Sequence, residues 1–150
     1  MSIVISEIEI AAPVAKVFDL ARKVEDFPKF MPDVKTVEVR ERRPDGHCIS
    51  YWEAVASLQN IKKIVRWEEE AHWNAVDFTS SFAQTKGDYK HYNGSWEFET
   101  EGDSTHVRLT VDYDLGLPLV GALINKLLDK IMKDNCDSML KALKEKAEGS

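Results

Sequence analysis

The sequence predicts one α+β domain, residues 1–150, in which a seven-stranded antiparallel sheet precedes a long C-terminal helix. Three observations predict this fold. Seven segments alternate apolar and polar residues as strands do, short turns containing Gly or Asn join most of them, and about 30 final residues repeat apolar positions every three or four. A chain of 150 residues is long enough to bury a substantial core as a single domain.

The N-terminal part is predicted to hold one strand and two short helices. The first ten residues alternate as a strand, and Ala12-Pro13 then opens a helix, because proline at a first helical position loses no hydrogen bond. Apolar residues recur on one face of this helix up to Val24. The next segment, Phe27 to Pro32, has two prolines and three large apolar side chains, so we expect a turn or a one-turn helix packed over the core.

From Val34 onward the apolar pattern changes to a period of two, which predicts six strands joined by short turns in a meander with one apolar face. The expected strands begin at Val34 and then cover Cys48–Leu58, Ile61–Trp73, Val76–Phe82, Tyr92–Phe98 and Val107–Leu115. The alternation in the third of these strands is poor. The sequence therefore leaves open whether its odd positions, with Trp67 and Glu69, or its even positions, with Arg66 and Glu68, point inward.

One helix is predicted from Leu119 to about Glu148, after the break at Gly116-Leu117-Pro118. Its apolar residues form a broad stripe that packs on the sheet. A strongly curved sheet wrapped around a single helix need not fill the space between them. We therefore expect an apolar cavity there, which binds a small ligand.

Composition and motifs exclude several classes of protein. The net charge of −6 argues against binding nucleic acid through bulk charge, although a local basic patch stays possible. Met1–Ile10 lacks a signal-peptide pattern, and the longest apolar run, Leu115–Ile124, is about half the length of a membrane span. We therefore expect a cytoplasmic protein without a membrane span.

No motif indicates a cofactor. The chain has no Gly-rich phosphate loop, no Ser-nucleophile elbow and no metal-ligand spacing, so we expect no metal and no cofactor. Cys48 and Cys136 are expected to be free thiols, and the four histidines to lie on the surface. We expect a monomer, with a dimer left open.

Two segments resemble a known protein family. The first is Val17-Phe18-Asp19-Leu20 followed by Val24–Pro32, and the second is Gly94–Phe98 followed by Thr105-x-Val107-x-Leu109. Together with the order of elements, they resemble the START-like (SRPBCC, birch-pollen-allergen-like) superfamily, and within it the polyketide cyclase/dehydrase and coenzyme Q-binding-protein branch. The resemblance implies the helix-grip fold, β-α-α-β6-α, in which the curved sheet wraps around the C-terminal helix.

The chain also departs from these relatives. In the coenzyme Q-binding proteins and the related ribosome-association toxin, a short stretch ending in Cys follows the proline, whereas here Pro32 is followed by Asp33-Val34-Lys35. Glu69 aligns with an Arg that is linked to activity in the middle strand of aromatase/cyclases, and Arg66 lies near it. Asn135 matches a polar Asn that faces the cavity in the last helix of that family.

The predicted ligand contacts are mostly aromatic and apolar side chains of the inner faces. They are Phe27, Phe30, Trp67, Phe78, Phe82, Tyr92, Trp96, Val111, Tyr113, Leu127, Ile131, Asn135 and Met139. Asn135 interrupts the apolar stripe of the last helix, and a buried amide needs a hydrogen-bond partner. That partner is a ligand oxygen, a neighbouring strand or an ordered water.

Three functions stay open. The first is binding of a hydrophobic or amphipathic molecule, such as a lipid, an isoprenoid quinone or an aromatic polyketide, in the cavity. The second, implied by the resemblance, is a polyketide aromatase/cyclase in which Tyr92 or Tyr113 assists as acid or base. Glu69 or Arg66 is a candidate for the same role, and the sequence fixes no catalytic residue. The third is a ribosome-associated interaction protein with a basic patch around Lys62.

Overall fold

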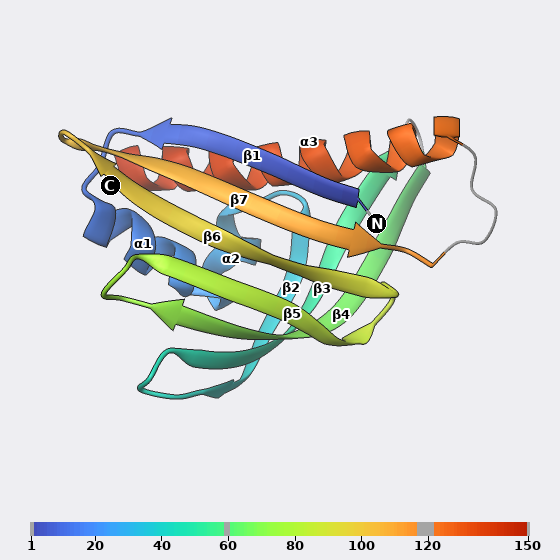
Figure 1. Ribbon diagram of the computed structural model, residues 1–150, viewed down its shortest axis with the longest axis horizontal. Helices are drawn as coiled ribbons and strands as arrows, with labels where there is room; N and C mark the ends of the chain where they lie inside the picture. Colours follow the sequence, from blue (N-terminus) through green and yellow to red (C-terminus); the bar gives the residue numbers. More distant parts are fainter. Residues whose placement is uncertain (1, 59–60, 117–121, 150) are drawn as a thin grey trace.

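The computed structural model describes residues 2–58, 61–116 and 122–149, and its architecture confirms the α+β helix-grip prediction (Figure 1). One antiparallel sheet has the strand order β1-β7-β6-β5-β4-β3-β2. The predicted start of the last helix, residues 119–121, lies outside the described residues. In chain order the elements are β1 (Ser2–Ile10), α1 (Val14–Arg22), a 3₁₀ turn (Val24–Asp26), α2 (Phe27–Phe30), β2 (Val34–Arg42), β3 (His47–Leu58), β4 (Ile61–Asn74), β5 (Thr79–Gly87), β6 (His91–Glu101), β7 (Ser104–Asp114) and α3 (Ala122–Glu148).

The sheet curves around α3, which lies along β1 and is also reached by β3 (Figure 1). On the β1 side, the Ser6 hydroxyl donates a hydrogen bond to the Asp137 carboxylate. On the β3 side, the Asn135 side-chain amide donates to the Val55 carbonyl oxygen at 3.4 Å. Strands β1 and β3, from opposite parts of the curved sheet, thus both bond to α3, and the interior of the protein lies between the sheet and this helix.

The helices α1 and α2 close one end of this space. Phe18 of α1 and Phe27 of α2 are both fully buried. The Phe18 ring meets the rings of Trp73, Phe78 and Phe98 edge to face, with centroids 5.4–5.8 Å apart. Because such aromatic pairs add to the free energy of apolar burial, this end is a filled and well-fixed core.

The two halves of α3 differ in how far the rest of the protein covers them. Leu140 and Leu143 in the second half are 1 % and 0 % exposed. Leu123, Ile124 and Leu127 in the first half are 73 %, 50 % and 36 % exposed. The apolar stripe is therefore buried at one end of the helix and open at the other. Among the helices that the structure describes, α3 included, none is long and apolar enough to cross a membrane.

The predicted strand Val76–Phe82 is wrong over its first residues, which form a turn. The Asn74 side-chain oxygen accepts hydrogen bonds from the backbone N–H groups of Val76 and Asp77, at 2.9 and 3.0 Å. Such a bond from an Asn side chain stabilises a turn in place of a strand. Val76 is accordingly 87 % exposed, and Phe78 has a φ angle of 55°. The turn directs the Phe78 ring into the closed end instead of the middle of the sheet.

Candidate functional site

A cavity of about 60 Å³ lies between the inner face of the sheet and α3. Its volume is enough for a few water molecules, so a lipid-sized ligand requires side chains or α3 to move. The wall is largely aromatic and apolar, and a few polar groups point into it. Flexible methionine side chains, Met132 and Met139, form part of the α3 side of the wall.

Seven of the predicted ligand contacts lie together around this cavity. They are Trp67, Phe82, Tyr92, Trp96, Val111, Asn135 and Met139. They come from four strands and α3. Alternation placed the residues of β5, β6 and β7 on the inner face, whereas the sequence left the facing of Trp67 on β4 open. Whether they contact a ligand is a proposal.

The other predicted contacts lie outside the cavity wall. Phe27 and Phe30 pack against each other at the closed end, with ring centroids 6.0 Å apart, and Phe78 lies in the turn before β5. The Tyr113 hydroxyl donates to the Asp129 carboxylate at 2.6 Å, which holds it beside the first half of α3. Two residues of α3 complete this group: Leu127, which is exposed, and Ile131, which is half-buried.

Several residues that line the cavity were not predicted as ligand contacts from the sequence. They include Trp52, Trp73, Ser80, Tyr89, Met132 and Cys136. The signal for Trp52 was ambiguous: Cys48, Ser50 and Trp52 share one face of β3 and are buried, but Ile49 and Tyr51 put apolar and aromatic side chains on the other face. Tyr89 had none, because it lies in the loop between β5 and β6, where no periodic pattern exists.

Odd positions of β4 face inward, which answers the question that the sequence left open. Trp67 and Glu69 are buried. Arg66 lies on the outer face, where its Nε donates to a Glu53 carboxylate oxygen at 3.0 Å. Glu68 pairs there with Arg40, also at 3.0 Å. An inward Arg66–Glu68 pair is therefore excluded, and the polar group that β4 supplies to the cavity is Glu69.

Glu69 is a buried carboxyl group with a single hydrogen bond from the described residues. It is 7 % exposed, and the Trp67 indole N–H donates to its Oε1 at 2.8 Å. Burial raises its pKa to about 7, and the Trp67 hydrogen bond opposes this rise. A β-bulge between Glu68 and Glu69 in the pairing of β4 with β5 lies beside it. Bulges of this kind reorient side chains near functional sites.

Four aromatic rings form a continuous wall beside Glu69. Trp52 and Trp67 are stacked with centroids 5.6 Å apart, and Tyr89 and Tyr92 are stacked at 4.6 Å. The Trp67 and Tyr92 rings join the two stacks at 5.1 Å. Burial raises the pKa of both tyrosines, so they are neutral phenols at physiological pH.

A second pair of polar groups lies further along the cavity, towards the closed end. Trp73 and Ser80 face each other across β4 and β5, and both line the cavity. The Trp73 indole N–H and the Ser80 hydroxyl are buried and have no hydrogen-bond partner among the residues the structure describes. Because buried polar groups are normally bonded, a water or a ligand atom is the expected partner of each.

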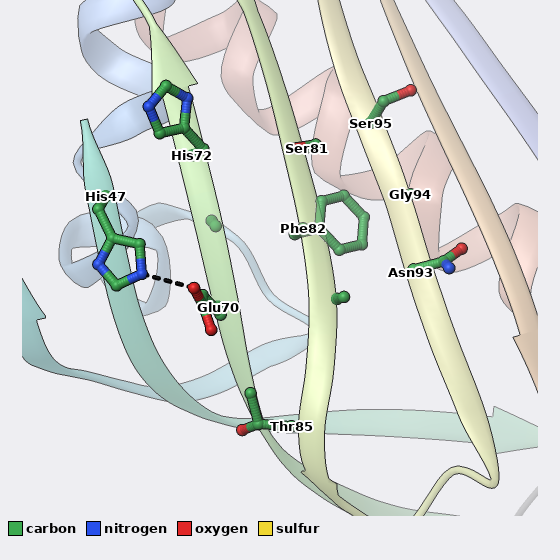
Figure 2. A pocket seen from close by; sticks show the side chains of 11 residues that line it. His47, Glu70, His72, Ser81, Phe82, Thr85, Asn93, Gly94 and Ser95 are labelled. Atoms are coloured by element: carbon green, nitrogen blue, oxygen red, sulfur yellow. Dashed lines mark hydrogen bonds and ion pairs between the residues drawn. The ribbon is translucent and has the colours of Figure 1, made fainter. Parts of the chain in front are cut away.

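A larger but open groove lies on the opposite, outer face of the sheet, across β4, β5 and β6 (Figure 2). It measures about 570 Å³ and is lined mainly by polar side chains, including Ser81, Asn93 and Ser95. His47 Nε2 lies 2.6 Å from a Glu70 carboxylate oxygen at one side of it. Water fills such a groove freely, so it offers a ligand much less apolar burial than the inner cavity does.

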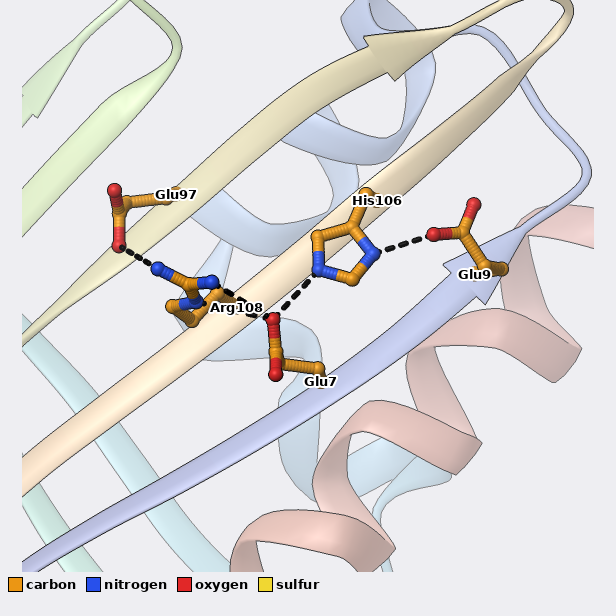
Figure 3. A network of polar contacts seen from close by, with 5 residues as sticks. All are labelled: Glu7, Glu9, Glu97, His106 and Arg108. Atoms are coloured by element: carbon orange, nitrogen blue, oxygen red, sulfur yellow. Dashed lines mark hydrogen bonds and ion pairs between the residues drawn. The ribbon is translucent and has the colours of Figure 1, made fainter.

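The outer face also carries a charged network across β1, β7 and β6 (Figure 3). His106 contacts Glu7 at 2.8 Å and also contacts Glu9, and Arg108 contacts Glu7 at 3.0 Å. These carboxylates raise the pKa of His106. Glu9, Glu101 and His106 bring potential metal-ligating atoms within 4.8 Å of one another. Glu9 pairs with His106, and Glu101 shares a side-chain hydrogen bond with Glu9. Both glutamates are exposed, and exposed acidic groups are common without a metal, so the cluster is explained as part of this surface network.

Comparison with known proteins places this fold and cavity in a family. Residues 10–140 match the family described as polyketide cyclase/dehydrase and lipid transport. The chain belongs to this family. The resemblance found in the sequence is thereby confirmed at the level of the polyketide cyclase/dehydrase group.

Solved structures of other proteins share the whole fold of this chain. The crystal structure of TTHA0849 from Thermus thermophilus is 34 % identical, with a TM-score of 0.88, and the match covers 99 % of this chain and 98 % of that one. The Zhui aromatase/cyclase from Streptomyces sp. R1128 has a TM-score of 0.85 over 98 % of this chain and 93 % of its own, and its 18 % identity shows the fold alone.

One curated relative is much longer than this chain. The actinorhodin polyketide synthase bifunctional cyclase/dehydratase of Streptomyces coelicolor is 28 % identical over 112 residues. The match covers 73 % of this chain but 34 % of the relative. The chain described here therefore spans about a third of the length of that relative.

Proposed function

We propose that the protein binds a hydrophobic or amphipathic small molecule in the cavity between the sheet and α3. The observation that carries this proposal is the wall itself, in which aromatic side chains surround a few buried polar groups that find no hydrogen-bond partner among the described residues. Ligand sites combine apolar walls with a small number of converging polar groups in this way. The family description, which includes lipid transport, supports the same function.

The small volume implies that binding opens the cavity. Met132 and Met139 can change rotamer at low cost, and the exposed start of α3 has few contacts to break. Burial of apolar ligand surface then supplies about 25 cal/mol per Å², from which the cost of ordering is subtracted. The proposal includes a cytoplasmic location, which the two free and buried cysteines support.

The proposal is tested by native mass spectrometry of protein purified from a bacterial host. Any bound molecule is then released by denaturation, extracted and identified. We expect a bound molecule, or a thermal stabilisation of the empty protein by a lipid extract. Ala71→Leu fills the cavity and should abolish both signals, whereas Ala83→Leu, on the exposed outer face of β5, should leave them unchanged. The proposed function would be refuted if the wild-type protein carried no bound molecule and no lipid extract raised its melting temperature.

A second candidate function, catalysis of a polyketide cyclisation or dehydration, is favoured by Glu69. A carboxyl group with a pKa of about 7 accepts and donates a proton at neutral pH, as such a reaction requires. The name of the actinorhodin relative supports this candidate. Loss of water from a synthetic poly-β-keto thioester, followed by absorbance, tests it: turnover should fall at least 100-fold in Glu69→Gln, and equal rates would exclude it.

A further inference from the structure

The charge of the cavity points to one class of ligand. Among the described residues that line it, Glu69 is the one whose side chain carries a charge near neutral pH, and no lysine, arginine or histidine of that set accompanies it. The titratable groups around it are Tyr92 of β6, Tyr89 of the loop before β6, Cys48 of β3 and Cys136 of α3. Burial raises the pKa of all four, so they stay neutral and supply no counter-charge to the carboxylate.

A buried carboxylate without a cation is costly. The Trp67 N–H satisfies one lone pair of Oε1, and Glu69 has no further hydrogen bond from the described residues. Burying an ionised group without a partner costs several kcal/mol, and an opposite charge placed beside it recovers much of this cost. A protonated or quaternary nitrogen supplied by a ligand would complete the pair.

The rings beside Glu69 favour the same chemistry. Trp52, Trp67, Tyr89 and Tyr92 form the continuous aromatic wall described above and line the cavity together with Glu69. The faces of aromatic rings, of indole above all, attract cations, and cages of aromatic side chains bind quaternary ammonium groups. A sulfate, phosphate or carboxylate headgroup would be repelled by Glu69 instead.

We infer that the ligand is an amphipathic organic cation, whose ammonium group lies between Glu69 and the aromatic wall and whose apolar part extends under α3. This inference rests on the proposed function and specifies its ligand class. The remaining polar pair, Trp73 and Ser80, lies four residues further along β4, about 13 Å away at 3.3 Å per residue. An oxygen atom of the ligand at that distance would satisfy both groups.

Isothermal titration calorimetry with three probes of equal length tests the inference: hexylammonium, hexan-1-ol and hexanoate. At pH 8 we expect hexylammonium to bind at least tenfold more tightly than hexan-1-ol, and hexanoate more weakly than both. The probe amine stays protonated between pH 6 and 8, while the ionised fraction of Glu69 falls about tenfold as the pH is lowered over that range. The preference for the amine should fall by the same factor.

Two neighbouring variants separate this effect from a change in folding. Glu69→Gln keeps an acceptor for the Trp67 N–H and should abolish the preference for the amine. Glu70→Gln removes the adjacent carboxylate, which points to the outer face beside His47, and should leave the preference unchanged (Figure 2). Thermal unfolding of both variants checks that they fold, and the pH dependence of the wild type does not need either variant.

The outcomes separate the inference from the proposed function. Equal binding of hexylammonium and hexan-1-ol, or a preference that survives in Glu69→Gln, would overturn the cationic ligand while leaving a hydrophobic site. Failure of all three probes to bind would also overturn the inference. Only if the purified protein carried no adduct and no lipid extract stabilised it would the proposed function fall as well.

Discussion

The two halves of α3 have the same apolar spacing but opposite surroundings. In the second half, Leu140 and Leu143 are buried, while in the first half Leu123, Ile124 and Leu127 face solvent. A stripe of apolar residues on a helix therefore does not by itself predict whether other parts of the protein bury it. In this protein the sealed half stabilises the fold, and the open half lies next to the space where we propose a ligand binds.

The same contrast is found on the sheet. At the closed end, Phe18 packs edge to face on Phe78 and Phe98, and Phe27 packs in the same way on Phe30. Around the cavity, buried polar atoms of Trp73 and Ser80 have no hydrogen-bond partner among the described residues, and Glu69 has one from them. Buried polar groups without hydrogen-bond partners lower the free energy of unfolding, so these groups at the cavity end reduce the stability of the protein.

The largest expected effect tests the sealed half of α3. Leu143→Ala should lower the free energy of unfolding by about 2–5 kcal/mol, because it leaves a void in a fully buried position. Leu123→Ala, in the exposed half of the same helix, should change it by less than about 0.5 kcal/mol. Urea denaturation measures both, and similar losses would show that the two halves contribute equally.

The next effect depends on pH and tests the cavity end. The pKa of Glu69 rises from 4.5 to about 7 on folding, so the folded state binds more protons in this interval and stability falls as the pH rises through it. At 1.36 kcal/mol per pH unit, the loss reaches about 3 kcal/mol above pH 7 as an upper bound. Glu69→Gln removes this loss.

Urea denaturation of wild type and Glu69→Gln between pH 4.5 and 8.5 measures the difference. The advantage of the variant should grow from pH 4.5 to pH 7 and then level off. A constant difference across this range would mean that Glu69 does not change its pKa on folding. Glu70→Gln is the control, because its carboxylate is exposed on the other face.

A smaller effect is expected at the second pair of polar groups. Ser80→Ala removes a buried hydroxyl that has no partner among the described residues, so the free energy of unfolding should rise by about 1 kcal/mol. Ser81→Ala, on the exposed face of the same strand, should be neutral within about 0.5 kcal/mol. A clear loss in Ser80→Ala would instead indicate a tightly held water at this point.

The smallest effect lies outside both regions, in the surface network of Figure 3. Hydrogen bonds to Glu7 and Glu9 raise the pKa of His106, so its stabilising contribution is present at low pH and is lost as the pH rises through the raised pKa. His106→Gln should therefore cost less than about 1 kcal/mol at pH 6 and nothing measurable at pH 9. A loss independent of pH would point to packing in place of charge.

Periodicity predicted the order of elements because each change from a two-residue to a three- or four-residue repeat marks a change of structure. It failed at Val76 and Phe78, where the Asn74 side chain stabilises a turn although the residues alternate correctly. It left β4 undecided because a charged residue, Glu69, occupies an inward position there. Long-range packing, and not local pattern, decides such positions.

The site was harder to predict than the fold. Inner-face residues such as Phe82 and Trp96 followed from alternation, whereas Tyr89 lies in a loop and Tyr113 is held by Asp129 outside the wall. The small cavity volume and the exposed start of α3 depend on how the curved sheet meets the helix. No single segment of the sequence contains that information.

The aromatic composition of the cavity has a practical consequence. The chain has four tryptophans, and all four, Trp52, Trp67, Trp73 and Trp96, line the cavity. Every indole fluorophore of the protein therefore senses the same enclosed space. A molecule entering it would change the intensity and wavelength of emission from all of them at once, so the protein contains its own optical probe of occupancy and needs no attached dye.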